Sequence, residues 1–467
     1  MASTASQPSE RLSLAIIGGG IAGLTLTIAL ITHCPSLSIT LYESASAFGE
    51  IGAGVGFEPV MVRTMRLIDP RIAAAFEKCA QGNTVTDPPK WFTVRVGDRR
   101  KIVDGDNVED GVVLEKAGKE KRKVRLGEEV FSIPARRGPR GGVHRAHFLD
   151  ELVKLVPDGI ARFRKKLVDV TEAQAGSGDA ILHFADGSTA QHSAVLGCDG
   201  IKARTRSIVL GDSDSVVPVF SGKYAYRGLI PMSKAVEIMG DVQPKTPQMY
   251  LGYHGHVLTF PIANGTIMNG TIVPSPCSLV HIDLFPVVAF SSRETWPEPN
   301  WVVKTSTADM LEDYKHWSPT VQSIMTNMKS PDIWALFNHR PASTYFSTKP
   351  LICLVGDAAH ATTPHQGAGA GMCVEDVHIL SELLSQCHSK ADLTRAFRAY
   401  DAVRRPRSQK LVDTSREAAM LWEFEGEGIG DDLEALERNA VKRMEWIWDH
   451  VIDEDLTRAR KMMEEES

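Results

Sequence analysis

The feature that most limits how this chain can fold is a glycine cluster, Gly18-Gly19-Gly20-Ile21-Ala22-Gly23, which follows the pattern GxGxxG. It stands between a short apolar strand predicted over Leu12–Ile17 and an apolar helix predicted over Ile21–Thr32. The first glycine allows a tight turn, the second lets the backbone approach a pyrophosphate, and the third lets the helix pack closely on the strand. A second strand predicted over Ser38–Tyr42 completes a βαβ unit, in which the two strands are parallel.

The second predicted strand ends at Glu43, twenty residues beyond Gly23. A carboxylate there can accept hydrogen bonds from both ribose hydroxyls of an adenosine, and it disfavours a 2′-phosphate. The start of the helix offers free N–H groups and a partial positive charge to phosphates. A GxGxxG pattern alone can also be a structural turn. With Glu43 in this place, Gly18, Gly20 and Gly23 indicate a Rossmann-like domain that binds FAD or NAD rather than NADP.

Two further strand ends favour FAD over NAD. Asp199 follows a strand predicted at residues 194–196, and Asp357 follows one predicted over Leu351–Val355. A helix then begins at about Gly369. An Asp in such a place can merely cap a turn, but it can also hold a ribityl hydroxyl. The helix start can stabilise negative charge on a reduced flavin.

With these motifs in place, the chain resembles the class A FAD-dependent aromatic monooxygenases of para-hydroxybenzoate hydroxylase fold. Within them it is most similar to the salicylate 1-monooxygenases, or salicylate hydroxylases. The resemblance extends from Leu12 to about Met463. The segments that carry it, besides the strand ends above, are Glu50–Phe57, Val143–Ala146, Tyr224–Gly228, Gln248–Gly252, Gly255–Pro261 and Pro364–Gly371.

The resemblance implies an α/β fold. A Rossmann-like FAD-binding domain of the GxGxxG type would carry an inserted antiparallel β-sheet domain for the substrate and a helical C-terminal region. The expected boundaries are 12–210 and 350–420 for the two parts of the FAD-binding domain, 211–349 for the substrate domain and 421–467 for the C-terminal helices. A charged stretch at about 97–142 is expected to be an exposed hairpin or loop insertion, with a lid over the flavin as the alternative.

The resemblance also implies the residues of the cofactor site. Glu43, Gly56, Arg145, Asp357 and Ala370 are expected to contact FAD, which would be bound without a covalent link. Arg145 also suits this place on chemical grounds, because a cation beside a dinucleotide and an anionic flavin is stabilising. The full set of expected cofactor residues is Gly18, Gly20, Gly23, Glu43, Gly56, Arg145, Asp199, Asp357, Gly369 and Ala370.

For the substrate, Arg227 is the first candidate. It stands in an otherwise apolar predicted strand, where a guanidinium needs a partner. A phenolate or carboxylate substrate would serve, as would a structural salt bridge. His339 is a second candidate for catalysis. The expected pocket residues are Tyr226, Tyr250, His256, Phe260 and Pro364.

Composition excludes several other kinds of protein. The net charge of −6 does not favour nucleic acid, and no apolar run approaches the ~20 residues that span a bilayer. Seven scattered cysteines without a CxxC spacing predict buried thiols in a reducing compartment, and no metal site is expected. The expected location is the cytoplasm. The oligomeric state stays open.

The expected reaction is hydroxylation of a small phenolic acid with O2 and a reduced nicotinamide. The donor would be NADH, with NADPH as an alternative, and no second GxGxxG supplies a separate nicotinamide domain. Decarboxylating hydroxylation of salicylate or a substituted salicylate to a catechol is the first expectation. A dearomatising hydroxylase of a phenolic polyketide and an FAD-dependent dehydrogenase that does not use O2 are the alternatives. Glu58 and Ala203 depart from the residues usual in the salicylate subgroup, which weakens the case for salicylate itself.

Overall fold

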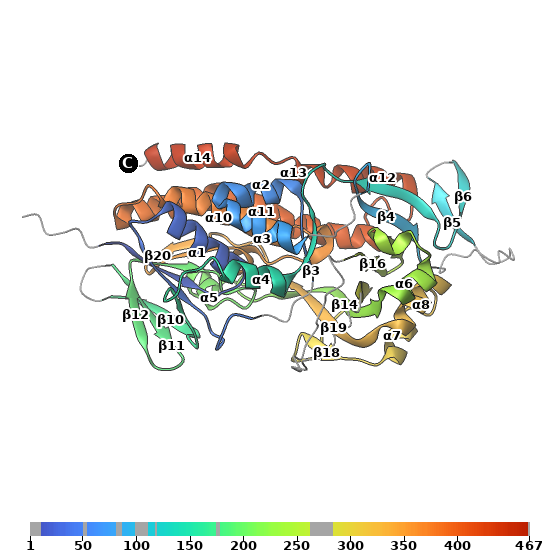
Figure 1. Cartoon of the computed structure of the whole chain (residues 1–467), viewed down its shortest axis with the longest axis horizontal. Coiled ribbons are helices and arrows are strands. Elements are labelled where there is room, and N and C mark those ends of the chain that lie inside the picture. The colour runs from blue at the N-terminus through green and yellow to red at the C-terminus, as the bar shows by residue number, and fades with distance from the viewer. Residues whose placement is uncertain are drawn as a thin grey trace, which may run out of the picture.

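The computed structural model describes residues 11–49, 54–80, 86–98, 111–116, 119–173, 178–261 and 284–465. Two sheets lie next to each other, and long helices run along one side of the molecule (Figure 1). Residues 50–53 of the motif segment Glu50–Phe57 lie outside the described residues.

The first sheet has six strands in the order β20 (Phe346–Thr348), β21 (Leu351–Leu354), β13 (Ala194–Gly197), β1 (Ser13–Ile17), β2 (Ser38–Tyr42) and β9 (Ala161–Arg162). The pairs from β21 through β9 are parallel, and β20 is antiparallel to β21. The carboxyl ends of parallel strands meet at one edge of a sheet. This places Gly18, Glu43, Asp199 and Asp357 along the same edge.

Both faces of this sheet are covered, which explains why β1 is apolar at every position from Leu14 to Ile17. Leu14 and Ile16 face a core with α1 (Ile21–His33) and α10 (Gly369–Leu384). Ala15 and Ile17 face a second core, formed with the three-stranded sheet β10 (Leu167–Glu172), β11 (Ala180–Phe184) and β12 (Thr189–His192). The predicted βαβ unit is present.

The second sheet has eight strands in the order β18 (Val302–Lys304), β19 (Lys329–Asn338), β14 (Val219–Pro231), β17 (Leu284–Ser292), β16 (Gly255–Thr259), β15 (Gln248–Gly252), β4 (Lys90–Val96) and β7 (Glu129–Pro134). The pair β15–β4 is parallel and the other pairs are antiparallel. The strands that belong to the inserted segment, β14 to β19, pair antiparallel as expected, and the parallel pair is made with β4 from an earlier part of the chain.

The charged insertion expected at about 97–142 is narrower than predicted. Its middle is an antiparallel hairpin of β5 (Gly111–Lys116) and β6 (Lys119–Arg125), in line with the hairpin interpretation. However, β7 belongs to the second sheet, and β8 (Gly141–His144) pairs with β3 (Gly54–Phe57). The strands β7 and β8, which the predicted insertion included, therefore pair with strands outside it.

The helices fall into three groups. Near the first sheet lie α2 (Pro59–Ile68), α3 (Pro70–Cys79), α4 (Arg145–Val153), α5 (Arg204–Leu210) and α9 (Asp357–His360), and the second sheet is covered on one face by α6 (Met232–Met239), α7 (Thr307–Asp313) and α8 (Pro319–Asn327). The long α11 (Lys390–Trp422) leads to α12 (Leu433–Lys442), α13 (Glu445–Trp448) and α14 (Ile452–Glu465), with α14 lying along the side of the molecule (Figure 1).

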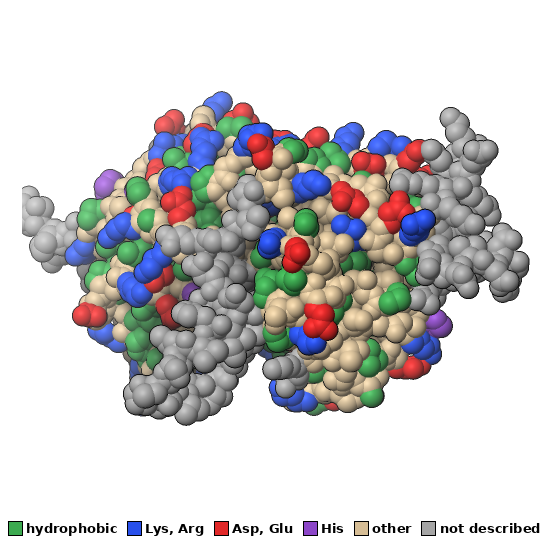
Figure 2. Space-filling model, turned by 45° about the vertical axis from the view of Figure 1, so that its right-hand side comes forward, with side chains coloured by type: hydrophobic (Ala, Val, Ile, Leu, Met, Phe, Trp, Pro, Cys, Tyr) green, Lys and Arg blue, Asp and Glu red, His purple; other side chains and the backbone are tan. Residues whose placement is uncertain are grey.

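Within the described part of the chain, no helix combines the length and apolarity needed to cross a membrane. Acidic and basic side chains are interspersed on the face shown in Figure 2.

Candidate active site

A cavity of about 850 Å³ lies between the carboxyl edge of the first sheet and the uncovered face of the second. Its lining includes the glycine loop after β1, the carboxylates at the ends of the neighbouring strands, and side chains from β14, β16 and β17. Such a crevice at the carboxyl ends of parallel strands is where open α/β sheets bind ligands.

The glycine loop has the geometry that a dinucleotide requires. Gly18 has φ +101°, and a methyl group there would lie 2.4 Å from the carbonyl oxygen of Cys198. A methyl group at Gly20 would meet no atom within 4 Å, so this position is open for a ligand to approach the backbone. Gly23 does not line the cavity. Its Cα packs against Gly18, which accords with helix packing rather than ligand contact.

Glu43 is held in place at the end of β2. Its Oε2 accepts a hydrogen bond of 2.7 Å from the Gly19 N–H, and its Oε1 accepts one of 2.7 Å from the Ala45 N–H. The carboxylate lines the cavity together with Lys165 and Lys166. An acid fixed beside cations fits the ribose and phosphates of an adenosine dinucleotide.

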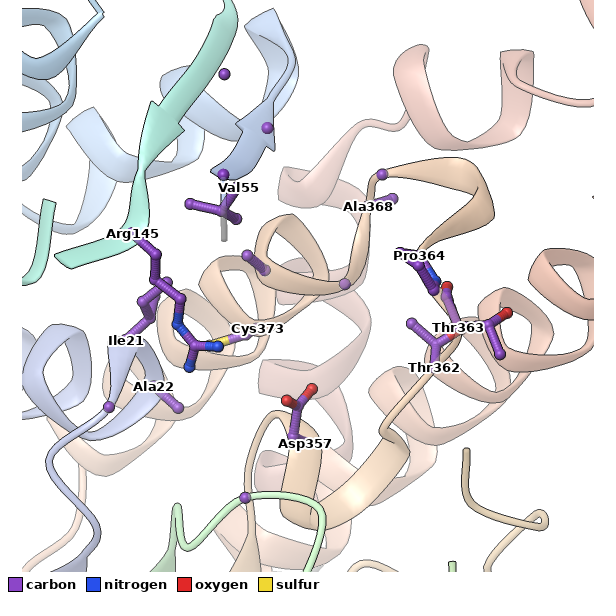
Figure 3. Close-up of a pocket in the computed structure, with 18 of the residues that line it drawn as sticks. Ile21, Ala22, Val55, Arg145, Asp357, Thr362, Thr363, Pro364, Ala368 and Cys373 are labelled. Carbon is purple, nitrogen blue, oxygen red and sulfur yellow. The ribbon is translucent and has the colours of Figure 1, made fainter. Parts of the chain in front are cut away.

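Asp199 and Asp357 also line the cavity but differ in their surroundings. Asp199 accepts hydrogen bonds from the Thr205 N–H at 3.0 Å and from the Thr205 hydroxyl, and burial raises the pKa of its carboxyl. Asp357 is exposed to the cavity while the residues around it are buried. In Figure 3 its carboxylate points into the space that Arg145 enters from the other side. Asp357 is thus the acid with a free face for a ligand.

Sequence reasoning missed the residue that positions Asp357. The buried Asp376 on α10 accepts hydrogen bonds from the Gly356 N–H at 3.2 Å and from the His360 ring at 2.5 Å. The buried Arg404 on α11 donates to Asp376 at 2.9 Å. These contacts fix the turn that presents Asp357, and no local motif reveals them because they join three elements.

The start of α10 borders the same cavity. Ala368, Gly369 and Ala370 line it, and the helix begins without a side-chain cap. Val55 and Gly56 of β3 line it from another side, and a methyl group at Gly56 would meet no atom within 4 Å. Together with α1, two helix starts face the cavity, which favours a ligand with negative charge. The donors, acids and open glycines fit FAD.

At the second sheet, Arg227 of β14 is a cation that lines the cavity, as does Lys90 at the start of β4. Its guanidinium lies 4.4 Å from the centre of the Trp334 ring. Asp332, the acid opposite it on β19, forms an ion pair with Lys304 at 2.8 Å instead. Among the described residues no carboxylate forms an ion pair with Arg227. Burial and the charge of Arg145 lower the pKa of Arg227 to about 10, so it stays a cation at neutral pH.

The prediction that Tyr226 and Tyr250 line the pocket is wrong. Successive side chains in a strand point to opposite faces, so Tyr226 faces away when Arg227 faces the cavity. Both tyrosines are buried in the core under α6, α7 and α8. The Tyr226 hydroxyl donates to Asp313 at 2.7 Å and the Tyr250 hydroxyl donates to Gln243 at 3.1 Å.

His256, Phe260 and Pro364 do line the cavity. The His256 ring is 1% exposed and stacks on Phe290 with ring centres 4.2 Å apart. A further lining histidine, His365, is buried next to both rings. Burial lowers the pKa of His256 and lowers that of His365 to about 3, so both imidazoles are neutral at physiological pH.

His339 is not part of the cavity. It follows the end of β19 and is 1% exposed, with its Nε2 2.9 Å from the carbonyl oxygen of Ile201. Its backbone N–H donates to Ala361 at 3.0 Å. This histidine joins the loops after β13 and α9, and burial lowers its pKa to about 3. Because His339 lies outside the cavity, the prediction that it acts in catalysis is wrong.

The part of the chain that matches the family model described as an FAD binding domain is residues 298–415. The FAD-dependent monooxygenase pigN of Monascus ruber is 38% identical, with 97% of each chain covered. The 6-methylsalicylate 1-monooxygenase atA of Aspergillus terreus is 35% identical, with 94% of this chain and 90% of that one covered. A solved structure described as a salicylate hydroxylase substrate complex is 31% identical, with a TM-score of 0.78 and coverage of 97% of this chain and 98% of that one.

Fold and site together define an enzyme that binds FAD and oxidises an aromatic ring. With these identities over nearly the whole length, the chain belongs to the class A FAD-dependent aromatic monooxygenases of the salicylate hydroxylase type.

Proposed function

We propose that this enzyme hydroxylates a phenolic aromatic acid, salicylate or a ring-substituted relative, with loss of CO2 to give a catechol, and that NADH is the electron donor. The single observation that carries the proposal is Arg227. A half-buried cation that lines the cavity, stacks on Trp334 and has no acidic partner among the described residues is suited to an anionic aromatic ligand.

The walls around Arg227 support an aromatic ligand. Met249, Leu258, Val288, Phe290 and Trp334 line the cavity from the second sheet. An apolar wall with one cation favours a flat ring that carries one anionic oxygen or carboxylate. It also keeps water out, which protects a reactive oxidant from side reactions.

The roles of the residues follow from these contacts. When bound, FAD supplies the redox chemistry that activates O2 and transfers one oxygen atom to the ring. Glu43, Arg145 and Asp357 would hold the cofactor. Arg227 would bind the phenolate oxygen and lower the pKa of the phenol, since an adjacent cation favours the ionised form. The neutral His256 would accept the phenol proton at Nε2.

The second candidate reaction differs from the first only in whether CO2 is lost. A dearomatising hydroxylase of a phenolic polyketide would also use a cation for the phenolate and an apolar wall. The similarity to an enzyme named 6-methylsalicylate 1-monooxygenase favours salicylate or a substituted salicylate as the substrate. Attack at a carbon that bears a carboxylate releases CO2, whereas attack at a carbon that bears an alkyl group leaves the ring dearomatised.

Product analysis tests the proposal directly. The FAD-loaded enzyme would be incubated with NADH, 18O2 and a panel of salicylates and 2,4-dihydroxybenzaldehydes, and products identified by mass spectrometry. A catechol with one 18O atom and one CO2 per NADH is the expected result. Labelled product from an aldehyde without CO2 release would establish the dearomatising reaction instead. NADH oxidation without 18O in any product would indicate a dehydrogenase.

A further inference from the structure

A row of polar side chains continues the cavity face of the second sheet beyond the cavity wall. On β14, Lys223 stands four residues before Arg227 and therefore on the same face. Ser292 on β17 pairs directly with Lys223, and His256 on β16 pairs with Phe290 of β17. Over this row lies Glu423, the residue that follows α11. Its side chain is 0% exposed.

These side chains form one continuous network. The His256 Nδ1 lies 3.2 Å from Glu423 Oε1, and Lys223 Nζ forms an ion pair with Glu423 Oε2. Lys223 Nζ also contacts Glu425 Oε2 at 2.8 Å, and Glu425 Oε1 lies 2.5 Å from His254 Nδ1. The network therefore runs from a buried imidazole that lines the cavity to His254, whose side chain is 64% exposed.

The charge states suit proton transfer. Burial lowers the pKa of His256. For Glu423, burial alone would raise the pKa, but hydrogen bonding from His256 and the charge of Lys223 lower it to about 2. Burial works against the charge on Lys223, yet Glu423 and Glu425 raise its pKa overall. At neutral pH a neutral His256 thus donates from Nδ1 to a carboxylate, which leaves Nε2 as a base.

The Nε2 of His256 is buried and has no hydrogen-bonding partner among the described protein atoms. Its residue lines the cavity that contains Arg227. The charged and titratable groups that face this network from the surrounding elements are Lys223 of β14, His254 and His256 beside and in β16, Tyr314 after α7, His365 before α10, and Glu423 and Glu425 after α11.

We propose that Glu423, Lys223, Glu425 and His254 form a proton relay that carries the substrate's phenol proton from His256 to solvent. The proposal rests on the proposed function, because a phenolic substrate supplies the proton. Glu423 is a positioning residue that acts through His256. Lys223, Glu425 and His254 provide the exit.

Each transfer in the relay moves one proton, and every group except His256 returns to its starting state. His256 changes from its Nδ1–H tautomer to its Nε2–H tautomer. The O–H bond of the phenol breaks, and its proton binds Nε2 of His256 while the Nδ1 proton passes to Glu423. Lys223 gives a proton to Glu425 and takes the one on Glu423. Glu425 passes its proton to His254, which releases it to water. The net change is one phenolate in the cavity, one proton in solvent and the Nε2–H tautomer of His256, with no oxidation or reduction.

The test uses the oxidised FAD enzyme without NADH, so no turnover occurs. The probe is 2-hydroxy-5-nitrobenzoate, whose phenolate absorbs visible light. Rapid mixing at a pH where the free phenol is protonated would follow phenolate formation, and a pH indicator would follow proton release. In the wild type the two signals should rise together. Glu423→Gln should slow phenolate formation by about tenfold to a hundredfold, because the orientation and basicity of His256 are lost.

Glu425→Gln tests the exit from a partly exposed position and leaves both members of the Lys223–Glu423 ion pair in place. Proton release should then lag behind phenolate formation. Glu417→Gln is the matched control, since this exposed carboxylate on α11 pairs with Arg443 at 3.7 Å and is outside the network. It should behave as the wild type. The absorbance spectrum of bound FAD should be the same in all three variants.

The possible failures are distinguishable. If the wild type neither binds nor ionises the probe, the proposed function fails and the relay with it. If the wild type ionises the probe and Glu423→Gln does so at an equal rate, the relay is refuted. If Glu423→Gln does not retain FAD, Glu425→Gln decides, and simultaneous phenolate and proton signals in that variant would overturn the proposal.

Discussion

Replacing Arg227 by Met separates a role in catalysis from a role in stability, because the two predict effects of opposite sign. Met keeps the length and apolar surface of the side chain and removes the charge. The low pKa of about 10 means that burial beside Arg145 disfavours the charged form. At about 1.4 kcal/mol per pH unit, the penalty relative to an ordinary arginine is about 3 kcal/mol.

The contact with Trp334 offsets part of this penalty. A cation–π contact contributes about 1 kcal/mol, and a methionine sulfur on the ring restores some of it. The free energy of unfolding of Arg227→Met should therefore equal that of the wild type or exceed it by about 1–2 kcal/mol. Activity should fall in contrast, because loss of one charge-assisted contact in the transition state is worth about 3 kcal/mol, or about a hundredfold in kcat/KM.

Thermal unfolding of the FAD-bound protein and coupled NADH oxidation measure the two effects. The matched control is Lys234→Met, which removes a 45% exposed cation from α6 and should change neither quantity. A fall in Tm of several degrees for Arg227→Met, with normal activity in the protein that remains folded, would show that the guanidinium is structural. The argument for an anion site at Arg227 would then be refuted.

Other variants test separate parts of the site. Asp357→Ala should weaken FAD binding by about 1–3 kcal/mol, because a ribityl hydroxyl loses its partner; equilibrium dialysis that finds unchanged affinity would contradict this. Tyr226→Phe should lower the free energy of unfolding by about 1 kcal/mol through loss of the Asp313 hydrogen bond and leave kcat unchanged, because this ring faces away from the cavity. Burial raises the pKa of Glu58 to about 7 despite the nearby Arg140, so Glu58 contributes stability at low pH that is lost as the pH rises through 7. The free energy of unfolding of Glu58→Gln minus that of the wild type should therefore increase by about 1–3 kcal/mol between about pH 5 and 8. Denaturant titrations of both proteins at the two pH values measure this difference, and a constant difference would refute the prediction. Steady-state kinetics should show a preference for NADH over NADPH, and the reverse preference would contradict that proposal.

Most of the cofactor site follows from short stretches of sequence. GxGxxG, Glu43, Asp199 and Asp357 each lie next to a strand that the apolar pattern predicts. The order of strands and helices makes the strands parallel, which brings their carboxyl ends to one edge. Local chemistry and connectivity are therefore sufficient to place these residues, and the structure agrees for the residues that line the cavity.

Which face of β14 lines the cavity could not be predicted from its sequence. Tyr224-Ala225-Tyr226-Arg227 carries large side chains on both faces, because one face packs under helices and the other lines the cavity. Period-2 alternation gives no signal when both faces are buried. The assignment of Tyr226 and Tyr250 to the pocket was therefore an error of one residue in strand orientation.

Three sets of contacts depend on the tertiary structure and could not be predicted from the sequence. Strand β4 joins the second sheet by pairing with β15, more than a hundred residues further along the chain, and β7 joins it by pairing with β4. Asp376 reaches the turn before Asp357 from another helix. Glu423 meets Lys223 and His256 from the end of α11, far along the chain. The sequence by itself determined which residues at the strand ends line the cavity, because each belongs to a contiguous motif whose backbone geometry demands particular residues. Contacts between distant side chains have no such local requirement, so only the packing of the two sheets and α11 decided which charges meet.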